Sequence, residues 1–254
     1  MPSEKVIIEL CGRVGKLLLA YGAETGRVEG TVEYIGAAAG VPISCHATMT
    51  ALFVDVDTDT ATHLVKVRTQ DFDLRKVDAV NTLSRQFTAG QINFTALQSG
   101  IARIEAQHRD YPWPIKILGA GLVSVAPMLL FQATWADLAL AFGVGIAGYL
   151  AAQLTARHTA TPYIAVAAGG AVIGLLATAL QLGGVGTSAD NIIISALMPL
   201  VPGVAITNSL RELIAKHTIS GLVRAVDAVM VAGAIGGGVV VGSALITLMM
   251  GGLR

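Results

Sequence analysis

Residues 198–213 read MPLVPGVAITNSLREL, a mostly apolar run that breaks its own helix. Pro199, Pro202 and Gly203 stand within five residues of one another. Each proline removes a backbone donor and clashes with a helical carbonyl group. Three polar residues then follow in a row: Thr207, Asn208 and Ser209. Whether this broken segment lies inside a membrane or beside one depends on the solvent for which the rest of the chain is built.

The composition is typical of a membrane protein. Hydrophobic residues make up 54% of the 254 residues and charged residues only 13%, whereas soluble domains average about 45–50% apolar and about 25% charged residues. The formal net charge is zero, so no general basic field attracts nucleic acid. The two cysteines, Cys11 and Cys45, form no paired or metal-spaced motif, which fits a reducing compartment.

Charged residues divide the chain into two halves. Residues 1–114 carry 11 Lys/Arg and 13 Asp/Glu, whereas residues 115–254 carry only 6 and 4. The join falls near RDYPWP at 109–114, where two prolines stop a helix and Tyr111 and Trp113 suit a membrane interface. We therefore predict a water-soluble domain at 1–114 and a transmembrane domain at 115–254.

The first half reads as a small α+β domain with its own core. Helical spacing of apolar residues predicts four helices, at 6–21, 28–39, 74–87 and 94–107. Gly22 and Gly40 suit the C-terminal caps of the first two. β-like runs predict three strands, at 43–48, 50–56 and 63–67.

The second half holds five apolar runs and predicts an α-helical membrane domain of five transmembrane helices. The runs lie at Ile115–Gln132, Ala136–Leu154, Tyr163–Leu182, Asn191–Ile206 and Ala225–Met250. A bilayer core of about 30 Å needs about 20 helical residues, so most runs are long enough to span. The fourth is short and contains the two prolines. An odd number of spans places the two termini on opposite sides.

Lysine and arginine predict the orientation, because cytoplasmic connections are enriched in them. Basic residues precede the first run, and the 207–224 connection carries Arg211, Lys216 and Arg224. The 131–137 and 183–190 connections carry none. We expect a multi-pass protein of the bacterial inner (plasma) membrane, with a cytoplasmic N-terminal domain and the C-terminus outside.

Glycine motifs in the second half indicate helix packing. GVGIAG at 143–148 matches the dinucleotide pattern but lies inside an apolar span with no preceding strand. Small residues let membrane helices approach closely. The same interpretation applies to the G-x-x-x-G pairs that begin at Gly170, Gly233 and Gly238.

The candidate metal and catalytic motifs do not match the residue patterns that such sites require. The acidic run at 55–59 resembles the start of a calcium loop, but Thr60 and Lys66 stand where glycine and glutamate are required. Cys45-His46 is too isolated for a zinc site. The sequence has no P-loop and no G-x-S-x-G elbow. We therefore expect no metal, no cofactor and no enzymatic activity.

Two interpretations of the broken segment stay open. Backbone freed by Pro199, Pro202 and Gly203 is tolerated in a bilayer only against protein or a water-filled cavity, and transporters bind polar substrates at such broken helices. Thr207, Asn208 and Ser209 would then add donors and acceptors. Alternatively, the segment is a kink at the cytoplasmic end of a span, with 207–209 capping the following helix and Arg211 in solvent.

Asp227 is an acid near the start of the fifth run, three residues after Arg224. The simpler interpretation is an ion pair at the membrane edge, favoured by the positive N-terminus of the helix. The functional interpretation is a proton-coupling carboxylate, because acids inside membranes often mark proton relays.

Several blocks resemble the threonine/serine exporter family. They are LLLAYGAETGRVE at 17–29, VNTLSRQFTAG at 80–90, LMPLVPGVAITNSLREL at 197–213 and HTISGLVRAVDA at 217–228. The resemblance spans nearly the whole chain. Full-length members look like a cytoplasmic domain followed by two five-span halves, and this chain resembles the split form with one half. A separate small five-span membrane subunit, or self-association, would supply the other half.

The resemblance implies export of a small polar carboxylate, driven by the proton gradient. Split relatives are linked to succinate, and unsplit ones to threonine and serine. The broken segment matches the family's LVPG block, so Pro199, Pro202, Gly203 and Asn208 would line or gate the path. Arg211 or Arg224 would attract the substrate carboxylate, because guanidinium groups bind carboxylates bidentately.

Gly22, Glu24, Arg27 and Glu29 match the family's GAE-x-x-R-x-E pattern. Helix capping and ion pairing explain them without a substrate, and the resemblance adds a gating or substrate-related role. Two rival functions remain. One is a membrane-anchored hydrolase with Glu24, Arg27 and Glu29 as its polar centre, and the other is a sensor or scaffold that transports nothing.

Overall fold

The computed structural model describes residues 2–56, 62–67, 72–107, 111–130, 133–159, 161–186 and 188–251. Packing divides the chain into two compact units. The first, here called the N-terminal unit, combines Met1–Arg109 with Val204–Ala225. The second, here called the helical unit, combines Asp110–Gly203 with Val226–Arg254. The segment 204–225 therefore belongs to the N-terminal unit, although it lies between two parts of the helical unit in sequence.

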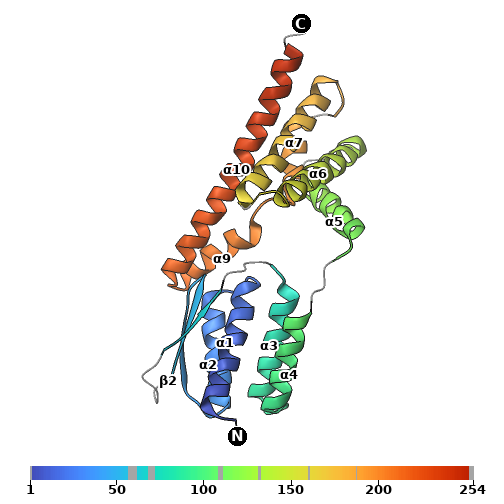
Figure 1. Cartoon of the computed structure of the whole chain (residues 1–254). Coiled ribbons are helices and arrows are strands. Elements are labelled where there is room, and N and C mark those ends of the chain that lie inside the picture. The colour runs from blue at the N-terminus through green and yellow to red at the C-terminus, as the bar shows by residue number, and fades with distance from the viewer. Residues whose placement is uncertain are drawn as a thin grey trace. The chain divides into compact units, whose positions relative to one another are not determined.

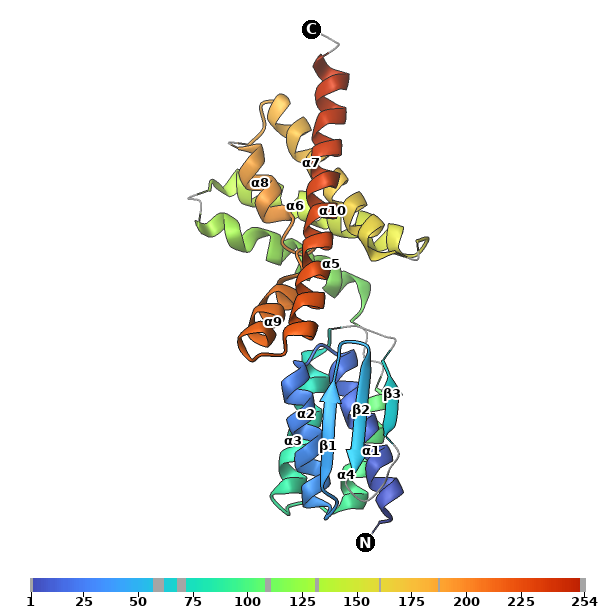
Figure 2. The same cartoon turned by 90° about the vertical axis from the view of Figure 1, so that its left-hand side faces the viewer.

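The N-terminal unit begins with two helices, a three-stranded sheet and two more helices (Figures 1 and 2). In order these are α1 (Glu4–Ala20), α2 (Thr25–Ala38), β1 (Ile43–Ala47), β2 (Ala51–Val56), β3 (His63–Lys66), α3 (Leu74–Thr88) and α4 (Phe94–Ala106). The four helices and three strands predicted for this part of the chain are confirmed. α1 and α2 lie between the sheet and the α3–α4 pair (Figure 1).

The sheet is an antiparallel meander in the order β1-β2-β3. Cys45 pairs with Val54, and Phe53 pairs with Leu64. Alternate residues of β1 and β2 are buried, as expected for strands with one face on a core and one in water. Residues 57–59 of the acidic run lie outside the described residues.

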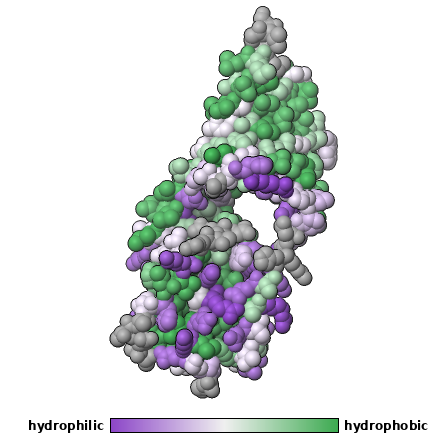
Figure 3. Space-filling model, in the orientation of Figure 1, coloured by the Kyte–Doolittle hydropathy of each residue, from purple (hydrophilic) through white to green (hydrophobic). Residues whose placement is uncertain are grey.

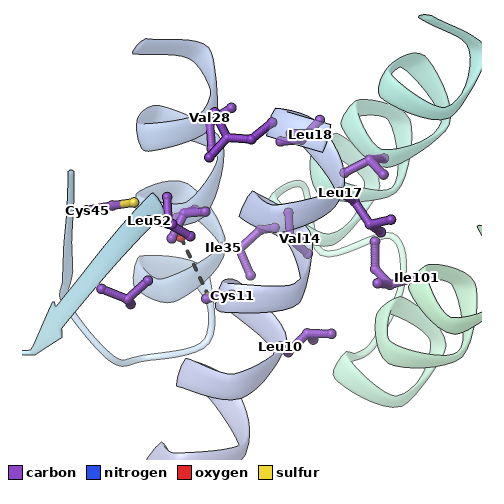
Figure 4. Close-up of a cluster of buried hydrophobic side chains, with 14 of the residues drawn as sticks. Leu10, Cys11, Val14, Leu17, Leu18, Val28, Ile35, Cys45, Leu52 and Ile101 are labelled. Atoms are coloured by element: carbon purple, nitrogen blue, oxygen red, sulfur yellow. Dashed lines mark hydrogen bonds between the residues drawn. The ribbon is translucent and has the colours of Figure 1, made fainter. Parts of the chain in front are cut away.

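Large aliphatic side chains form the core of this unit (Figure 4). Leu18 and Leu52 are fully buried, as are Val14, Val28 and Ile35. Burying one such side chain stabilises a fold by about 1.5–3 kcal/mol. These contacts join α1, α2 and β2 into one body that can carry functional groups on its surface.

Both cysteines belong to this core and both are free thiols. The Cys11 thiol contacts the carbonyl oxygen of Val32 at 3.8 Å. Burial raises the pKa of Cys11 to about 12. Burial, followed by the charges of Glu29 and Glu33, raises the pKa of Cys45 to about 12. Because only thiolates act as nucleophiles and metal ligands, both cysteines are packing residues at neutral pH.

The helical unit is built from apolar helices. They are α5 (Trp113–Val125), the 3₁₀ helix η1 (Ala126–Leu130), α6 (Trp135–Ala156), α7 (Pro162–Leu182), α8 (Ala189–Ala196) and the later part of α10 (Thr218–Gly251). Hydrophobic residues cover most of the surface of this unit in the view of Figure 3, and a small patch of hydrophilic residues interrupts it. Apolar surface of this extent suits lipid better than water.

Four segments of the described chain are long and apolar enough to cross a membrane. They are Trp113–Leu130, Trp135–Ala156, Pro162–Leu182 and Thr218–Met249. These correspond to four of the five predicted spans. The remaining run, 191–206, is divided between α8 and the start of α9 (Gly203–Ile214), which have 8 and 12 residues. Five long spanning helices are therefore not found in the described residues.

The break between α8 and α9 falls where the two prolines predicted it. Turn hydrogen bonds take up several backbone amides that the break releases. The amide of Met198 donates to Ser195 O at 3.2 Å, and that of Leu200 donates to Leu197 O at 2.8 Å. Pro199 and Pro202 are half-buried. Local turns therefore supply part of the backbone pairing for which one of the two interpretations required protein contacts or a water-filled cavity.

Glycines join α7 to α10 by direct backbone approach. A Cβ added at Gly238 would lie 2.1 Å from Ala167 O, and one added at Gly242 would lie 2.0 Å from Ala171 O. On α7, a Cβ at Gly170 would lie 2.5 Å from Ile235 O. Helix packing is thus confirmed for two of the three G-x-x-x-G pairs. Gly233 and Gly237 differ, because an added Cβ would meet nothing within 4 Å.

Candidate functional site

The turn between α1 and α2 forms one side of the candidate site. Gly22 has a φ of +90°, which side chains disfavour. The amide of Ala23 donates to Leu18 O at 2.9 Å and closes the end of α1. A Cβ at Gly22 would lie 2.6 Å from the ring of Phe72. The predicted capping role of Gly22 therefore has a geometric cause, and its carbonyl oxygen is left to bond elsewhere.

Helix α9 packs on this turn through polar side chains. The Asn208 side-chain amide donates to Gly22 O at 3.0 Å, and the Thr25 backbone amide donates to the Glu212 carboxylate at 3.1 Å. Asn208 and Glu212 are one helical turn apart, so both lie on the same face of α9. Thr207, Asn208 and Ser209 lie inside this helix, so the expectation that they cap its start is wrong.

A buried ion pair secures the contact. The Arg224 guanidinium, in the first turns of α10, donates to the Glu212 carboxylate at 3.2 Å and to Ala23 O at 3.3 Å. The Glu212 side chain is 1% exposed and that of Arg224 is 6% exposed. Gly221 lets α10 approach α9, because a Cβ there would lie 3.0 Å from Ser209 O. The predicted 207–224 connection is thus a helical hairpin bound to the α1–α2 turn.

Sequence reasoning missed Glu212 as part of this site. Its i,i+4 relation to Asn208 was visible, but its partner Thr25 lies 187 residues away. The pairing expected for Arg224 also differs. Arg224 binds Glu212, whereas Asp227 accepts a hydrogen bond from the Tyr163 hydroxyl at 2.8 Å. Asp227 and Tyr163 both belong to the helical unit.

A cavity of about 230 Å³ lies within the N-terminal unit, beside the α1–α2 turn. Its lining combines two sets of predicted residues: Gly22, Glu24 and Arg27 from the GAE-x-x-R-x-E motif, and Thr207, Asn208 and Arg211 from the segment after the prolines. Ala23, Leu74, Val77 and Val204 complete it. We call it the α2–α9 cavity. Two motifs that are far apart in sequence therefore form one site.

Charged groups dominate the polar part of the α2–α9 cavity. Arg211 and Glu24 form an ion pair, with their side chains 61% and 20% exposed. Arg27 also lines the cavity, and its guanidinium has no hydrogen bond or ion pair among the described residues. The Thr207 hydroxyl donates to Val204 O at 3.1 Å. Two guanidinium groups and one carboxylate thus share a small volume.

Other predicted residues lie elsewhere. Pro199, Pro202 and Gly203 belong to the helical unit. Ser209 is buried, and its hydroxyl donates to Ile206 O of its own helix at 2.8 Å. These four residues do not line the α2–α9 cavity.

Glu29, the last residue of the GAE-x-x-R-x-E motif, has a structural role. Its carboxylate accepts a hydrogen bond from the Ala47 amide at 2.8 Å, and Glu33 accepts one from the Cys45 amide at 3.1 Å. These are the amides of β1 that face away from β2. The two carboxylates therefore cover an edge that would otherwise be free to pair with another strand. Because Glu29 does not line the α2–α9 cavity, the three residues of the proposed hydrolase centre do not converge there.

Comparison with known proteins gives one match. A family model described as "Putative threonine/serine exporter" matches residues 9–246. The match begins inside α1 and ends inside α10, so it covers both units. Neither the curated proteins nor the solved structures give a match.

Proposed function

Because the chain belongs to the threonine/serine exporter family, we propose that it is a subunit of a secondary transporter in the bacterial inner membrane that exports small polar carboxylates. The observation that carries the proposal is the family match across both units, together with four helices suited to spanning a bilayer. The candidate substrates are threonine, serine and a dicarboxylate such as succinate. The N-terminal unit would face the cytoplasm.

The proton gradient is the proposed driving force, and Asp227 is the proposed coupling group. Its carboxylate accepts a hydrogen bond from the Tyr163 hydroxyl, and Asp227 lies within the span Thr218–Met249. An acid inside a spanning segment is costly and commonly marks a proton pathway. Arg224 is not needed as its partner, since Arg224 binds Glu212.

A second membrane subunit or a second copy of the chain would complete the transporter. The described residues hold four helices suited to spanning a bilayer, whereas transporters of this type commonly place their substrate between two repeats. The outward-facing glycines Gly233 and Gly237 support a helix neighbour beside α10, because small residues allow close helix approach.

Flux from proteoliposomes tests the proposal. The chain would be reconstituted with and without the candidate small subunit, and export of threonine, serine and succinate would be measured under an imposed proton gradient. We expect flux that an uncoupler abolishes. Asp227→Asn should remove gradient-driven export, and the matched variant Asp78→Asn, at an exposed position of α3, should keep it.

Each part of the proposal has its own contrary result. Uncoupler-resistant flux would reject the proton gradient as the driving force, and full flux from an isolated monomer would reject the second subunit. If none of the three substrates moves under any condition, the chain is not an exporter of these carboxylates.

A further inference from the structure

Among the residues that the structure describes, one guanidinium of the α2–α9 cavity is paired and one is not. Arg211 is held by Glu24, whereas Arg27 lines the cavity without a described partner. Arg27 lies in the first turn of α2 (Thr25–Ala38), where the helix dipole also favours an anion. When a cavity holds more cationic side chains than carboxylates to pair with them, it is suited to binding an anionic ligand.

The frame around these charges is rigid. Gly22 O is fixed by Asn208, Ala23 O by Arg224 and the Thr25 amide by Glu212. The side chains of Asn208, Glu212 and Arg224 are buried. This network holds α9 on the α1–α2 turn, and it therefore fixes the positions from which Arg27 and Arg211 extend. A ligand would meet preorganised charges, which lowers the cost of binding.

We propose that the α2–α9 cavity is a binding site for a small carboxylate, held by Arg27 and by Arg211 after exchange of Arg211 from Glu24 to the ligand. The assignment deepens the proposed function, because it names a site on the N-terminal unit where an exported carboxylate binds. Its volume of about 230 Å³ lies below the roughly 300–1,000 Å³ of drug-sized pockets. A ligand of a few heavy atoms therefore fits better than a nucleotide or a lipid.

Exchange of the ion pair explains the presence of Glu24. The Arg211 side chain is largely exposed, so its pair with Glu24 is weak and a ligand carboxylate can replace it at small cost. While the cavity is empty, Glu24 neutralises one of the two cations. Glu24 therefore competes with the ligand, whereas Arg27 only attracts it.

Calorimetric titration of the full chain in detergent tests the site. The probes are succinate and L-threonine, with succinamide and L-threoninamide as analogues that lack a carboxylate. We expect both carboxylates to bind and both amides to fail. Arg27→Gln should weaken carboxylate binding by about tenfold or more, because it removes a charged hydrogen-bond donor. Position 27 is exposed, so the Arg27→Gln variant should still fold.

Glu24→Gln is the sharper variant, since it should improve binding. Without the competing carboxylate, succinate should bind about two- to fivefold more tightly, the range expected for loss of an exposed ion pair. L-Threonine has an ammonium group that can stay beside Glu24, so no tightening is expected for it. The comparison of the two probes therefore distinguishes a dicarboxylate from an amino acid as the preferred ligand.

Arg13→Gln is the matched control. Arg13 binds Glu105 in the same unit but does not line the α2–α9 cavity, so its loss should leave all affinities unchanged. Equal binding of succinate and succinamide, or wild-type affinity in Arg27→Gln, would overturn the assignment. Failure of the site and failure of the proposed function are separable. Export without binding here rejects the site, and binding without any export rejects the transporter.

Discussion

The two units build their cores from side chains of different size. The core of the N-terminal unit is made of large aliphatic residues such as Leu18 and Leu52, whereas the helical unit uses many alanines and glycines. In water, burying a large apolar side chain is itself favourable. Between lipid chains that gain is absent, and helices associate through close van der Waals contact. The size of the core residues therefore indicates whether each unit is built for water or for lipid.

The chain has natural probes that report on each unit separately. Both cysteines lie in the N-terminal unit, at Cys11 and Cys45, and both are buried. The two tryptophans, Trp113 and Trp135, lie in the helical unit. Thiol labelling and tryptophan fluorescence therefore follow unfolding of the two units in the same sample.

The largest effect should come from a buried charge of the N-terminal unit. Glu212→Ala leaves the Arg224 guanidinium buried without its carboxylate, and losing one partner of such a pair costs about 3–5 kcal/mol. Thiol labelling along a denaturant series should show the N-terminal unit unfolding at a lower concentration. The control is Glu105→Ala, whose pair with Arg13 is one-third exposed. An equal effect from both variants would contradict the role given to burial.

A matched pair of leucines tests the solvent difference itself. Leu18 is fully buried in the N-terminal unit, and Leu122 is 58% exposed on α5. Leu18→Ala should destabilise its unit by about 2–5 kcal/mol, as measured by thiol labelling. Leu122→Ala should leave the fluorescence transition of the helical unit nearly unchanged, because lipid solvates the leucine as well as protein does. A large shift from Leu122→Ala would indicate that this face is covered by protein.

Two glycines of α10 give the smallest and most local test. Gly238→Val would force a side chain against Ala167 O, whereas a Cβ at Gly233 meets nothing within 4 Å. Overpacking of this kind costs about 1–3 kcal/mol, so the fluorescence transition should fall to lower temperature for Gly238→Val alone. If Gly233→Val has the larger effect in the isolated chain, the assignment of the α7–α10 contact is wrong.

Local signals were enough to find most elements. The spacing of apolar residues located the helices of the N-terminal unit, and the prolines located the break before Gly203. The sequence places most of α9 in the 207–224 connection, because the fourth apolar run ends at Ile206 and the polar residues Thr207, Asn208 and Ser209 follow it. Its buried face becomes visible only when Gly22 O and the Thr25 amide are placed opposite it.

The candidate site was predictable in its parts but not in its assembly. Glu24 and Arg211 were each identified, yet nothing in the sequence shows that they form an ion pair across 187 positions. Glu212 was missed because its partner is likewise remote. The glycine motifs have the same limit, because Gly238 and Gly233 stand in identical patterns and only the structure shows which of them touches α7.

The contact between α7 and α10 also restricts how the helical unit can move. Carbonyl oxygens of α7 occupy the space beside Gly238 and Gly242 of α10. A small sliding or rotation of one helix against the other would bring these oxygens into a clash with larger side chains of α10. In the proposed transport cycle we therefore expect α7 and α10 to move together as one body, with the conformational change in the other helices or in the break at Pro199 and Pro202.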